Sequence, residues 1–234
     1  MEVKARAHAM RVQAHLTEVA LQCLLECGIT DTTLEDVAVR AGLAQGAVSA
    51  HFSDKSALIS AAIEGLRWPL DIGEKLSHYR GHRQPLRLLY DRLCIQISRC
   101  IDTPGQWRRM TLVFSQCGYT EWPSIAIDRV LYLQESAIAN LVHVLKFAKS
   151  RRQLRADIDV DSAARCLNAL MTGVLSQNIG KPIDGIRINI RECLLNFLKC
   201  IEQKTEYQSN IVGNVHRTSR AKPTIVDWTY TSEG

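Results

Sequence analysis

Apolar residues recur along most of the chain at intervals of three and four positions, the spacing of one face of an α-helix. One such face runs from Val12 to Cys27 and is followed by Gly28, a residue suited to ending a helix. Beyond Asp54 the pattern predicts helices over residues 54–80, 85–102, 105–117, 124–150, 160–178 and 186–204. Nothing in the pattern predicts a pair of strands. We expect an all-α protein in which one long helix, residues 54–80, links two parts.

A short helix is predicted to begin at Leu34. Thr33 and Asp36 are three positions apart, which is close to a capping box. Gly42 should end this helix after about two turns, because the turn needs a backbone conformation that a side chain would oppose.

A second short helix is expected from Ala44 to Ala50, and a third helix should start at Asp54 with Ser53 as its cap. Two short helices joined by a turn that contains glycine form a helix-turn-helix. An ordinary helical hairpin would have the same spacing, so the pattern alone leaves both structures open. The expected organisation is a three-helix helix-turn-helix domain at residues 1–53 and a larger helical domain at residues 54–204.

Composition supports a folded chain of this kind. The 234 residues are 46% hydrophobic and 23% charged, which is enough apolar material to bury a core. No apolar stretch approaches the length of a membrane span, and the N-terminus lacks the apolar run of a signal peptide, so we expect a cytoplasmic location and no membrane partner. Residues 205–234 are rich in polar residues without a helical period and are expected to form a flexible tail.

The distribution of charge does not by itself favour nucleic acid. The net charge of the chain is +5, but residues 1–60 hold five Lys or Arg and seven acidic residues, a balance of −2. Residues 61–160 hold fifteen basic and ten acidic residues. A DNA-binding N-terminus must therefore be argued from its pattern rather than from its charge.

Cysteine and histidine give no sign of a metal site. The eight cysteines include no C-x-x-C pair and fall mostly at apolar positions, where we expect reduced thiols that pack as small hydrophobic groups. His78 and His82 are four residues apart but lie in a polar, Arg-rich stretch. We expect no cofactor and no metal.

The N-terminal motifs resemble those of the TetR family of transcriptional repressors. They are the run from Thr32 to Ala38, then Ala41 to Leu43, Gly46 to Val48, and His51 to Leu58. The similarity covers about residues 10–65. A weaker similarity, over Met110 to Glu121, is to the multidrug-efflux-repressor subgroup.

This resemblance implies a homodimer that binds a palindromic operator through the helix at 44–50. It also implies that Thr33 and Lys55 contact phosphate. The candidate DNA-binding residues are Thr33, Ala44, Gln45, Gly46, Ala47, Ser49, Ala50, His51 and Lys55.

Two of these positions depart from the family pattern. Ser49 stands where the family usually has tyrosine, and Gln45 stands where lysine is frequent. Both changes remove affinity for the DNA backbone. Lys4, Arg6 and Arg11 in the N-terminal arm could restore some of it.

The resemblance further implies a helical pocket for a small apolar or cationic inducer. The residues expected to face inward are Arg67, Trp68, Met110, Phe114, Asp128, Tyr132, Met171 and Leu175. Asp128 is the candidate partner of a ligand cation, because a carboxylate on an apolar face needs a positive partner. An arginine could equally fill that role, and the apolar residues could simply be core.

The two C-terminal helices carry the prediction of a dimer. The apolar face of residues 160–178 is wider than a one-sided surface helix needs, so part of it should be buried against a second copy. Two helices from each copy would then form a four-helix bundle. The candidate interface residues are Ala163, Leu167, Leu170, Val174, Ile190, Leu194, Phe197 and Ile201.

Three functions fit these patterns. A ligand-responsive repressor is favoured, with an operator duplex, a small-molecule inducer and a second copy as its partners. The resemblance to the subgroup implies that such a repressor controls an efflux pump. A helical-bundle enzyme is disfavoured, because the sequence has no nucleophile motif, metal-binding motif or Gly-rich phosphate loop. A dimer of the same fold that has lost DNA binding is the third alternative.

Overall fold

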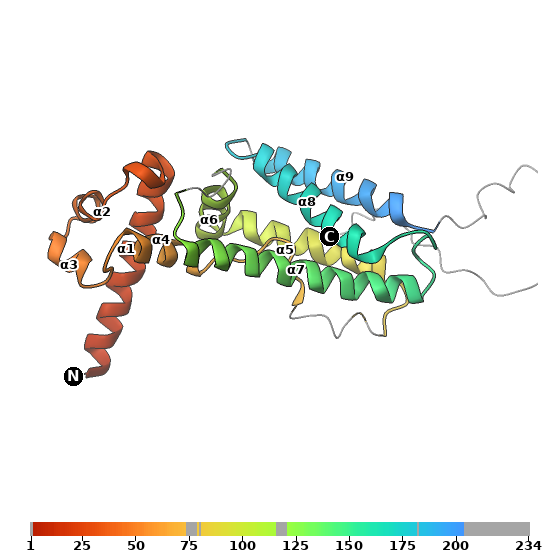
Figure 1. Ribbon diagram of the computed structural model, residues 1–234, viewed down its shortest axis with the longest axis horizontal. Coiled ribbons are helices and arrows are strands. Elements are labelled where there is room, and N and C mark those ends of the chain that lie inside the picture. Colours follow the sequence, from red (N-terminus) through yellow and green to blue (C-terminus); the bar gives the residue numbers. More distant parts are fainter. Residues whose placement is uncertain (1, 74–78, 80, 116–120, 182, 204–234) are drawn as a thin grey trace, which may run out of the picture.

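The computed structural model describes residues 2–73, 79, 81–115, 121–181 and 183–203, with the side chains of residues 2–5 excepted. These residues form an all-α structure, as predicted, and the ordered elements are helices joined by turns (Figure 1). The helices are α1 (Glu2–Asp31), α2 (Leu34–Ala41), α3 (Gln45–Ser49), α4 (Lys55–Glu64), α5 (Pro85–Asp102), α6 (Pro104–Ser115), α7 (Ser124–Ser150), α8 (Val160–Gln177) and α9 (Ile183–Ile201). The predicted tail at 205–234 lies outside the described residues.

The short N-terminal helices form where the sequence predicts them. Thr33 caps α2 in an extended conformation, and its capping box with Asp36 is complete. Gly42 ends α2 in the left-handed region at φ 66°, which explains the glycine at this turn. Gly28 interrupts α1 at φ 85°, so this helix is kinked close to its end.

The start of α4 is shifted by one residue from the prediction. Asp54, rather than Ser53, is the cap, and its carboxylate accepts a hydrogen bond from the backbone N–H of Ala57 at 2.7 Å. Ser53 Oγ lies 3.3 Å from the Asp54 carboxylate and donates to it.

The predicted long helix over residues 54–80 is wrong. The helix ends at Glu64 and is capped by Gly65, and the chain continues through residues 66–72 without regular structure. Leu66, Trp68, Leu70 and Ile72 are all buried, and Pro69 between them is buried too, so most of this segment packs into the core. The backbone N–H of Asp71 donates to the carbonyl oxygen of Trp68 at 3.0 Å in a turn, and Pro69 cannot donate the hydrogen bond that a continuing helix requires.

The larger part of the molecule is built from α5 to α9. In Figure 1 the long α7 runs beside α5, while α8 and α9 form a pair on the side away from α2 and α3. The predicted bounds of α5 and α7 are confirmed, and α6, α8 and α9 differ from prediction by a few residues at their ends.

Two hydrophobic clusters hold the chain together. The smaller one joins α1, α2, α3 and α4 around Leu16, Val37, Val48 and Phe52. The larger one contains the buried faces of α5 to α9 together with further residues of α1 and α4. Because α1 and α4 belong to both clusters, a movement of either helix would affect both parts of the molecule. The division of the chain at residue 53 stays a prediction.

Among the helices in the described residues, none combines the length and apolar character that crossing a membrane requires.

Candidate nucleic-acid interface and ligand pocket

The helix-turn-helix presents the exposed face of α3 at one end of the molecule (Figure 1). Val48 and Phe52 are buried and fix α3 against α1 and α4. Gln45 and Ser49, four positions apart, are exposed on the opposite face. The other predicted DNA contacts of this stretch are exposed at Ala44, Gly46 and Ala50 and half-buried at Ala47 and His51.

Thr33 is exposed at the N-terminus of α2, but its polar groups already have partners within the helix. The Asp36 carboxylate accepts from the Thr33 hydroxyl at 2.6 Å and from the Thr33 backbone N–H at 2.8 Å. These hydrogen bonds lower the pKa of Asp36. A phosphate contact at Thr33 would therefore compete with a carboxylate that the fold places there.

Lys55 also has a partner inside the chain. Its Nζ donates to the carbonyl oxygen of Thr30 at 2.5 Å, which ties the start of α4 to the end of α1. An ammonium group has three donors, so this bond leaves capacity for a phosphate. Lys55 can thus join the two helices and keep donors for a further acceptor.

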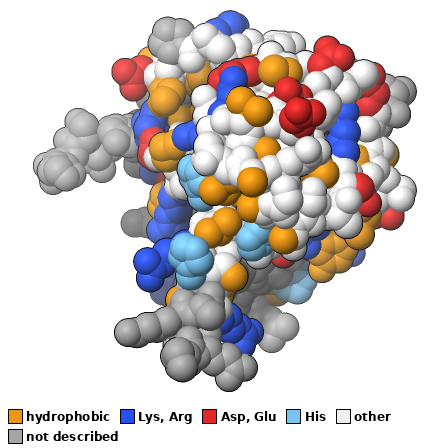
Figure 2. Space-filling model, turned by 90° about the vertical axis from the view of Figure 1, so that its left-hand side faces the viewer, with side chains coloured by type: hydrophobic (Ala, Val, Ile, Leu, Met, Phe, Trp, Pro, Cys, Tyr) orange, Lys and Arg blue, Asp and Glu red, His pale blue; other side chains and the backbone are white. Residues whose placement is uncertain are grey.

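Positive charge is sparse around α2 and α3. Figure 2 looks onto this end of the molecule, where uncharged and hydrophobic side chains fill the centre, histidines lie below it and acidic groups gather above it. Arg40 on α2 forms an ion pair with Glu26 at 2.5 Å. Arg6 and Arg11 are exposed on the part of α1 that extends beyond the buried Leu16. The side chain of Lys4 lies outside the described residues.

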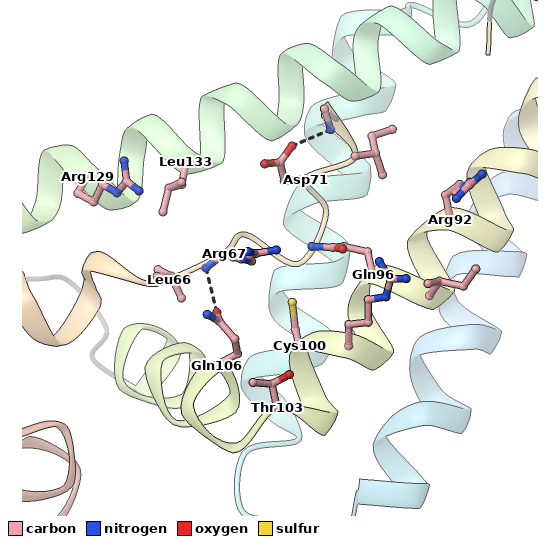
Figure 3. A pocket seen from close by; sticks show the side chains of 14 residues that line it. Leu66, Arg67, Asp71, Arg92, Gln96, Cys100, Thr103, Gln106, Arg129 and Leu133 are labelled. Carbon is pink, nitrogen blue, oxygen red and sulfur yellow. Dashed lines mark hydrogen bonds between the residues drawn. The ribbon is translucent and has the colours of Figure 1, made fainter. Parts of the chain in front are cut away.

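A cavity of about 640 Å³ opens between α5, α7 and the segment at 66–73 (Figure 3). Gln96 and Cys100 reach toward Arg67 from α5, and Arg129 and Leu133 project from α7. The residues around the cavity are Leu66, Arg67, Asp71, Ile72, Gly73, Arg92, Ile95, Gln96, Arg99, Cys100, Thr103, Gln106, Arg129 and Leu133.

A second cavity, of about 500 Å³, lies between the helix-turn-helix and the start of α7. His51 and Phe52 line it on one side, and Ile125 and Arg129 line it on the other. His51 was predicted to contact DNA, yet it is half-buried and faces this junction. Arg129 borders both cavities.

The structure separates the predicted ligand-binding residues into three groups. Only Arg67 lines the larger cavity. Five others lie in the packed core. There, Trp68 Nε1 donates to Asn168 Oδ1 at 2.8 Å, and the Trp68 and Phe114 rings pack edge-on with their centroids 5.6 Å apart. These five are Trp68, Met110, Phe114, Met171 and Leu175. Their role in a ligand site stays a prediction, and it requires the core to open.

The prediction that Asp128 and Tyr132 face inward is wrong. Both are exposed on α7, and neither borders a described cavity. The buried face of α7 is instead formed by residues such as Ala126, Val130 and Ala137. Water solvates the Asp128 carboxylate, so it needs no ligand cation, and the expectation of a cationic ligand loses its anchor.

Most of the cavity residues were missed because the cavity brings together distant segments of the chain. A local signal was nevertheless present. Arg92, Gln96 and Arg99 recur at intervals of four and three and therefore share one face of α5. Arg129 and Leu133 likewise share a face of α7.

Comparison with known proteins gives this arrangement a family. Residues 16–62 match the family model described as "Bacterial regulatory proteins, tetR family". These residues include the capped α2, the Gly42 turn and the exposed α3. Residues 16–62 of this chain are a TetR-family domain.

Other regulators are similar to this chain over most of its length. The HTH-type transcriptional repressor BepR of Brucella suis biovar 1 is 25% identical over 174 residues, covering 74% of this chain and 83% of BepR. The HTH-type transcriptional regulator AcrR of Shigella flexneri is 24% identical over 187 residues, covering 78% of this chain and 85% of AcrR.

Solved structures share the fold beyond the TetR-family domain. Native NalD, the secondary repressor of the MexAB-OprM multidrug efflux pump in Pseudomonas aeruginosa, has a TM-score of 0.68 at 26% identity and covers 83% of this chain and 98% of its own. SmeT, the repressor of the Stenotrophomonas maltophilia efflux pump SmeDEF, has a TM-score of 0.65 at 22% identity, with coverages of 82% and 90%.

The predicted dimer residues are divided between the core of a single copy and its surface. Ala163, Leu167, Ile190, Leu194 and Ile201 are buried within a single copy, so the prediction that they await a partner is wrong for these five. The α8–α9 pair and the neighbouring helices bury them.

Three predicted interface residues remain accessible. Leu170 is exposed, and Val174 and Phe197 are half-buried. Ile188 on α9, which was not predicted, is 58% exposed. An apolar side chain of this size on a surface is typical of an interaction site when others lie near it.

Polar contacts join the TetR-family domain to the wall of the larger cavity. Gln106 on α6 accepts from the backbone N–H of Arg67 at 3.0 Å, and its amide donates to the carbonyl oxygen of Gly65 at 2.5 Å. Arg109, one turn along α6, pairs with Glu18 on α1 at 2.8 Å. The segment that lines the cavity is thus bonded to α6, and α6 is bonded to α1.

Proposed function

We propose that this TetR-family chain is a transcriptional repressor that binds a palindromic operator as a dimer and leaves it when a small molecule binds. The observation that carries the proposal is the exposed face of α3 within a matched TetR-family domain. The relatives named above are regulators, and they are similar to this chain over about three quarters of its length. We propose no catalytic role.

The exposed residues of α3 would recognise the DNA sequence. Gln45 offers an amide that can bond a base edge, and the small Gly46, Ser49 and Ala50 allow the helix to lie close to the floor of the major groove. Contacts to phosphate would come from Lys55 and from Arg6 and Arg11 on the extension of α1.

Dimerisation falls to the outer faces of α8 and α9. Leu170, Ile183 and Ile188 are the exposed large apolar side chains of this pair that a second copy would cover. Gly173 has nothing within 4 Å of the position where a Cβ would stand, so α8 leaves room there for a close approach. Two such pairs would form a four-helix bundle.

The position of the larger cavity suggests how a ligand would release the repressor from its operator. Its wall at residues 66–73 is the direct continuation of α4, and α4 begins at Lys55 in the DNA-binding domain. A ligand that fills the cavity would shift this segment and, through Gln106, also α6. The two copies of α3 would then lose the spacing of one DNA turn, about 34–36 Å. A hundredfold release requires only about 2.7 kcal/mol of differential binding.

The regulated gene is proposed from the relatives. NalD and SmeT are named as repressors of multidrug efflux pumps, and this chain is similar to both in structure. We propose that it too controls an efflux pump.

The test of this function is retention of a preferred duplex by the purified full-length chain. Duplexes enriched from a random pool at low salt should stay bound when unrelated duplex is added in excess, and Gln45→Ala should reduce that preference. Equal affinity for all duplexes would overturn the repressor and leave a dimer that has lost DNA binding. That alternative draws on the −2 balance of residues 1–60 and on the engaged Arg40.

A further inference from the structure

The larger cavity is rich in arginine. Arg67 comes from the segment after α4, Arg92 and Arg99 come from α5, and Arg129 comes from α7. Among the described residues that line the cavity, Asp71 is the only carboxylate. Three separate elements thus contribute arginines to the lining of one cavity, and Figure 3 shows Arg67, Arg92 and Arg129 on these elements.

Asp71 can offset only one of these four positive charges. Its Oδ1 accepts from Asn140 Nδ2 at 3.0 Å and from the backbone N–H of Gly73 at 2.9 Å, so the carboxylate is used to hold the 66–73 segment against α7. Within the described part of the chain, Arg67, Arg99 and Arg129 form no ion pair. The cavity therefore carries an excess of positive charge.

The floor of the same cavity is apolar. Leu66, Ile72 and Cys100 are almost fully buried, and Leu133 and Ile95 complete the surface. Burial raises the pKa of the Cys100 thiol to about 11, with the Arg67 charge acting in the opposite direction, so this thiol stays neutral and apolar in character. A volume of about 640 Å³ lies within the range of sites for small organic molecules.

From this combination we infer that the effector is an amphipathic organic anion, whose acidic group binds the arginines and whose apolar body lies on Leu66, Ile72 and Leu133. A guanidinium group bonds carboxylate, sulfate and phosphate in the same forked geometry, so these headgroups share one recognition chemistry. The inference rests on the proposed function for its regulatory meaning, and it replaces the cationic ligand expected from Asp128.

Solvated surface arginines are the competing explanation. Arg67, Arg99 and Arg129 are each exposed, and water alone can satisfy them. The arginines line a cavity whose floor is apolar, and this separates the two explanations. A ligand with an acidic group and an apolar chain should gain affinity from the arginines and from the apolar floor.

Calorimetry on the full-length chain without DNA tests the inference. The probes are decanoate, decyl sulfate and decyltrimethylammonium, which share a ten-carbon chain, and acetate, which has the headgroup of decanoate alone. All are used below micelle-forming concentrations. Both long-chain anions should bind about tenfold or more tightly than the long-chain cation. Acetate should bind much more weakly than decanoate.

Arg99→Gln and Arg129→Gln should each weaken decanoate binding by about tenfold, while Arg151→Gln, a change at an exposed arginine outside the cavity, should leave it unchanged. Equal binding of anion and cation, or decanoate binding that neither cavity variant weakens, overturns the inference. Because no DNA is present, these results are independent of the operator experiment, and failure of either proposal leaves the other intact.

Discussion

The guanidinium group of Arg109 on α6 donates a hydrogen bond to the carboxylate of Glu18 on α1 at 2.8 Å. The same guanidinium donates to the carbonyl oxygen of Gly105 at 2.9 Å, within its own helix. The Arg109 side chain is only 13% exposed, whereas Glu18 is 41% exposed. This partly buried pair joins α6, which borders the larger cavity, to α1, the first helix of the TetR-family domain.

Loss of the Glu18 carboxylate should destabilise the chain. Glu18→Ala leaves the guanidinium of Arg109 without its acidic partner in a largely buried position, at a cost of about 1 kcal/mol in the free energy of unfolding. The matched control is Glu135→Ala, which breaks the pair with Arg165, where both side chains are about 60% exposed. That change should cost less than about 0.5 kcal/mol. Urea unfolding measures both, and equal losses would show that the Glu18–Arg109 pair acts only as a surface contact.

The capping box of α2 should make stability depend on pH. Hydrogen bonds from Thr33 lower the pKa of Asp36 in the folded chain. A carboxyl group with a lowered pKa contributes stability that is complete above its unfolded pKa of about 4 and is lost as the pH falls through the folded value. The stability difference between the wild type and Asp36→Asn should therefore be larger at pH 7 than at pH 3. A difference that stays constant over this range would contradict the assignment.

Arg11 should contribute to DNA affinity without contributing to sequence preference. If it contacts one phosphate, Arg11→Ala should reduce the slope of log affinity against log salt by about 0.9. Specific and random duplexes should be weakened to the same extent. Arg83→Ala is the control, because Arg83 is exposed beside α5 and far along the chain from the helix-turn-helix. An unchanged salt slope for Arg11→Ala would place this arginine off the DNA.

Dimerisation and folding should respond to different residues of α9. Ile188→Asp puts a charge on an exposed apolar position, so the chain should stay helical and become monomeric. Leu194→Asp puts a charge at a position that is fully buried within one copy, and it should destabilise the fold itself by several kcal/mol. Sedimentation and circular dichroism separate the two effects. A stable Ile188→Asp dimer would place the interface elsewhere.

Local sequence signals predicted much of this fold. The Thr33–Asp36 capping box marks the start of α2, and Gly42 marks its end. Pro85 marks the residue at which α5 begins. Each of these signals acts through neighbouring backbone groups, which is why the sequence alone revealed them.

The failed prediction of a long linking helix has a different cause. The segment from Leu66 to Ile72 contains enough apolar residues to suit a helix, and only the surrounding core decides which of them are buried. Gly65 and Pro69 were the signals against a helix.

The larger cavity could not be predicted as a whole because its walls come from four parts of the chain. The shared face of Arg92 and Arg99 was readable on α5, but nothing local places Arg129 of α7 or Arg67 opposite them. Asp128 was misplaced because the sequence does not show which face of α7 the other helices cover. Its neighbour Ile127 packs against the core, whereas Asp128, the next residue along α7, is exposed.

The symmetry of the preferred duplex tests the central proposal most directly. Sequencing of the duplexes that the full-length chain enriches from a random pool should give two inverted half-sites whose centres lie about one helical turn, or 10–10.5 base pairs, or a multiple of it, apart. Repeating the selection with Gln45→Ala should change the preferred bases in both half-sites while keeping their spacing. Enrichment of no sequence, or of a single unrepeated site that Gln45→Ala leaves unaltered, would contradict recognition of an operator by two copies of α3.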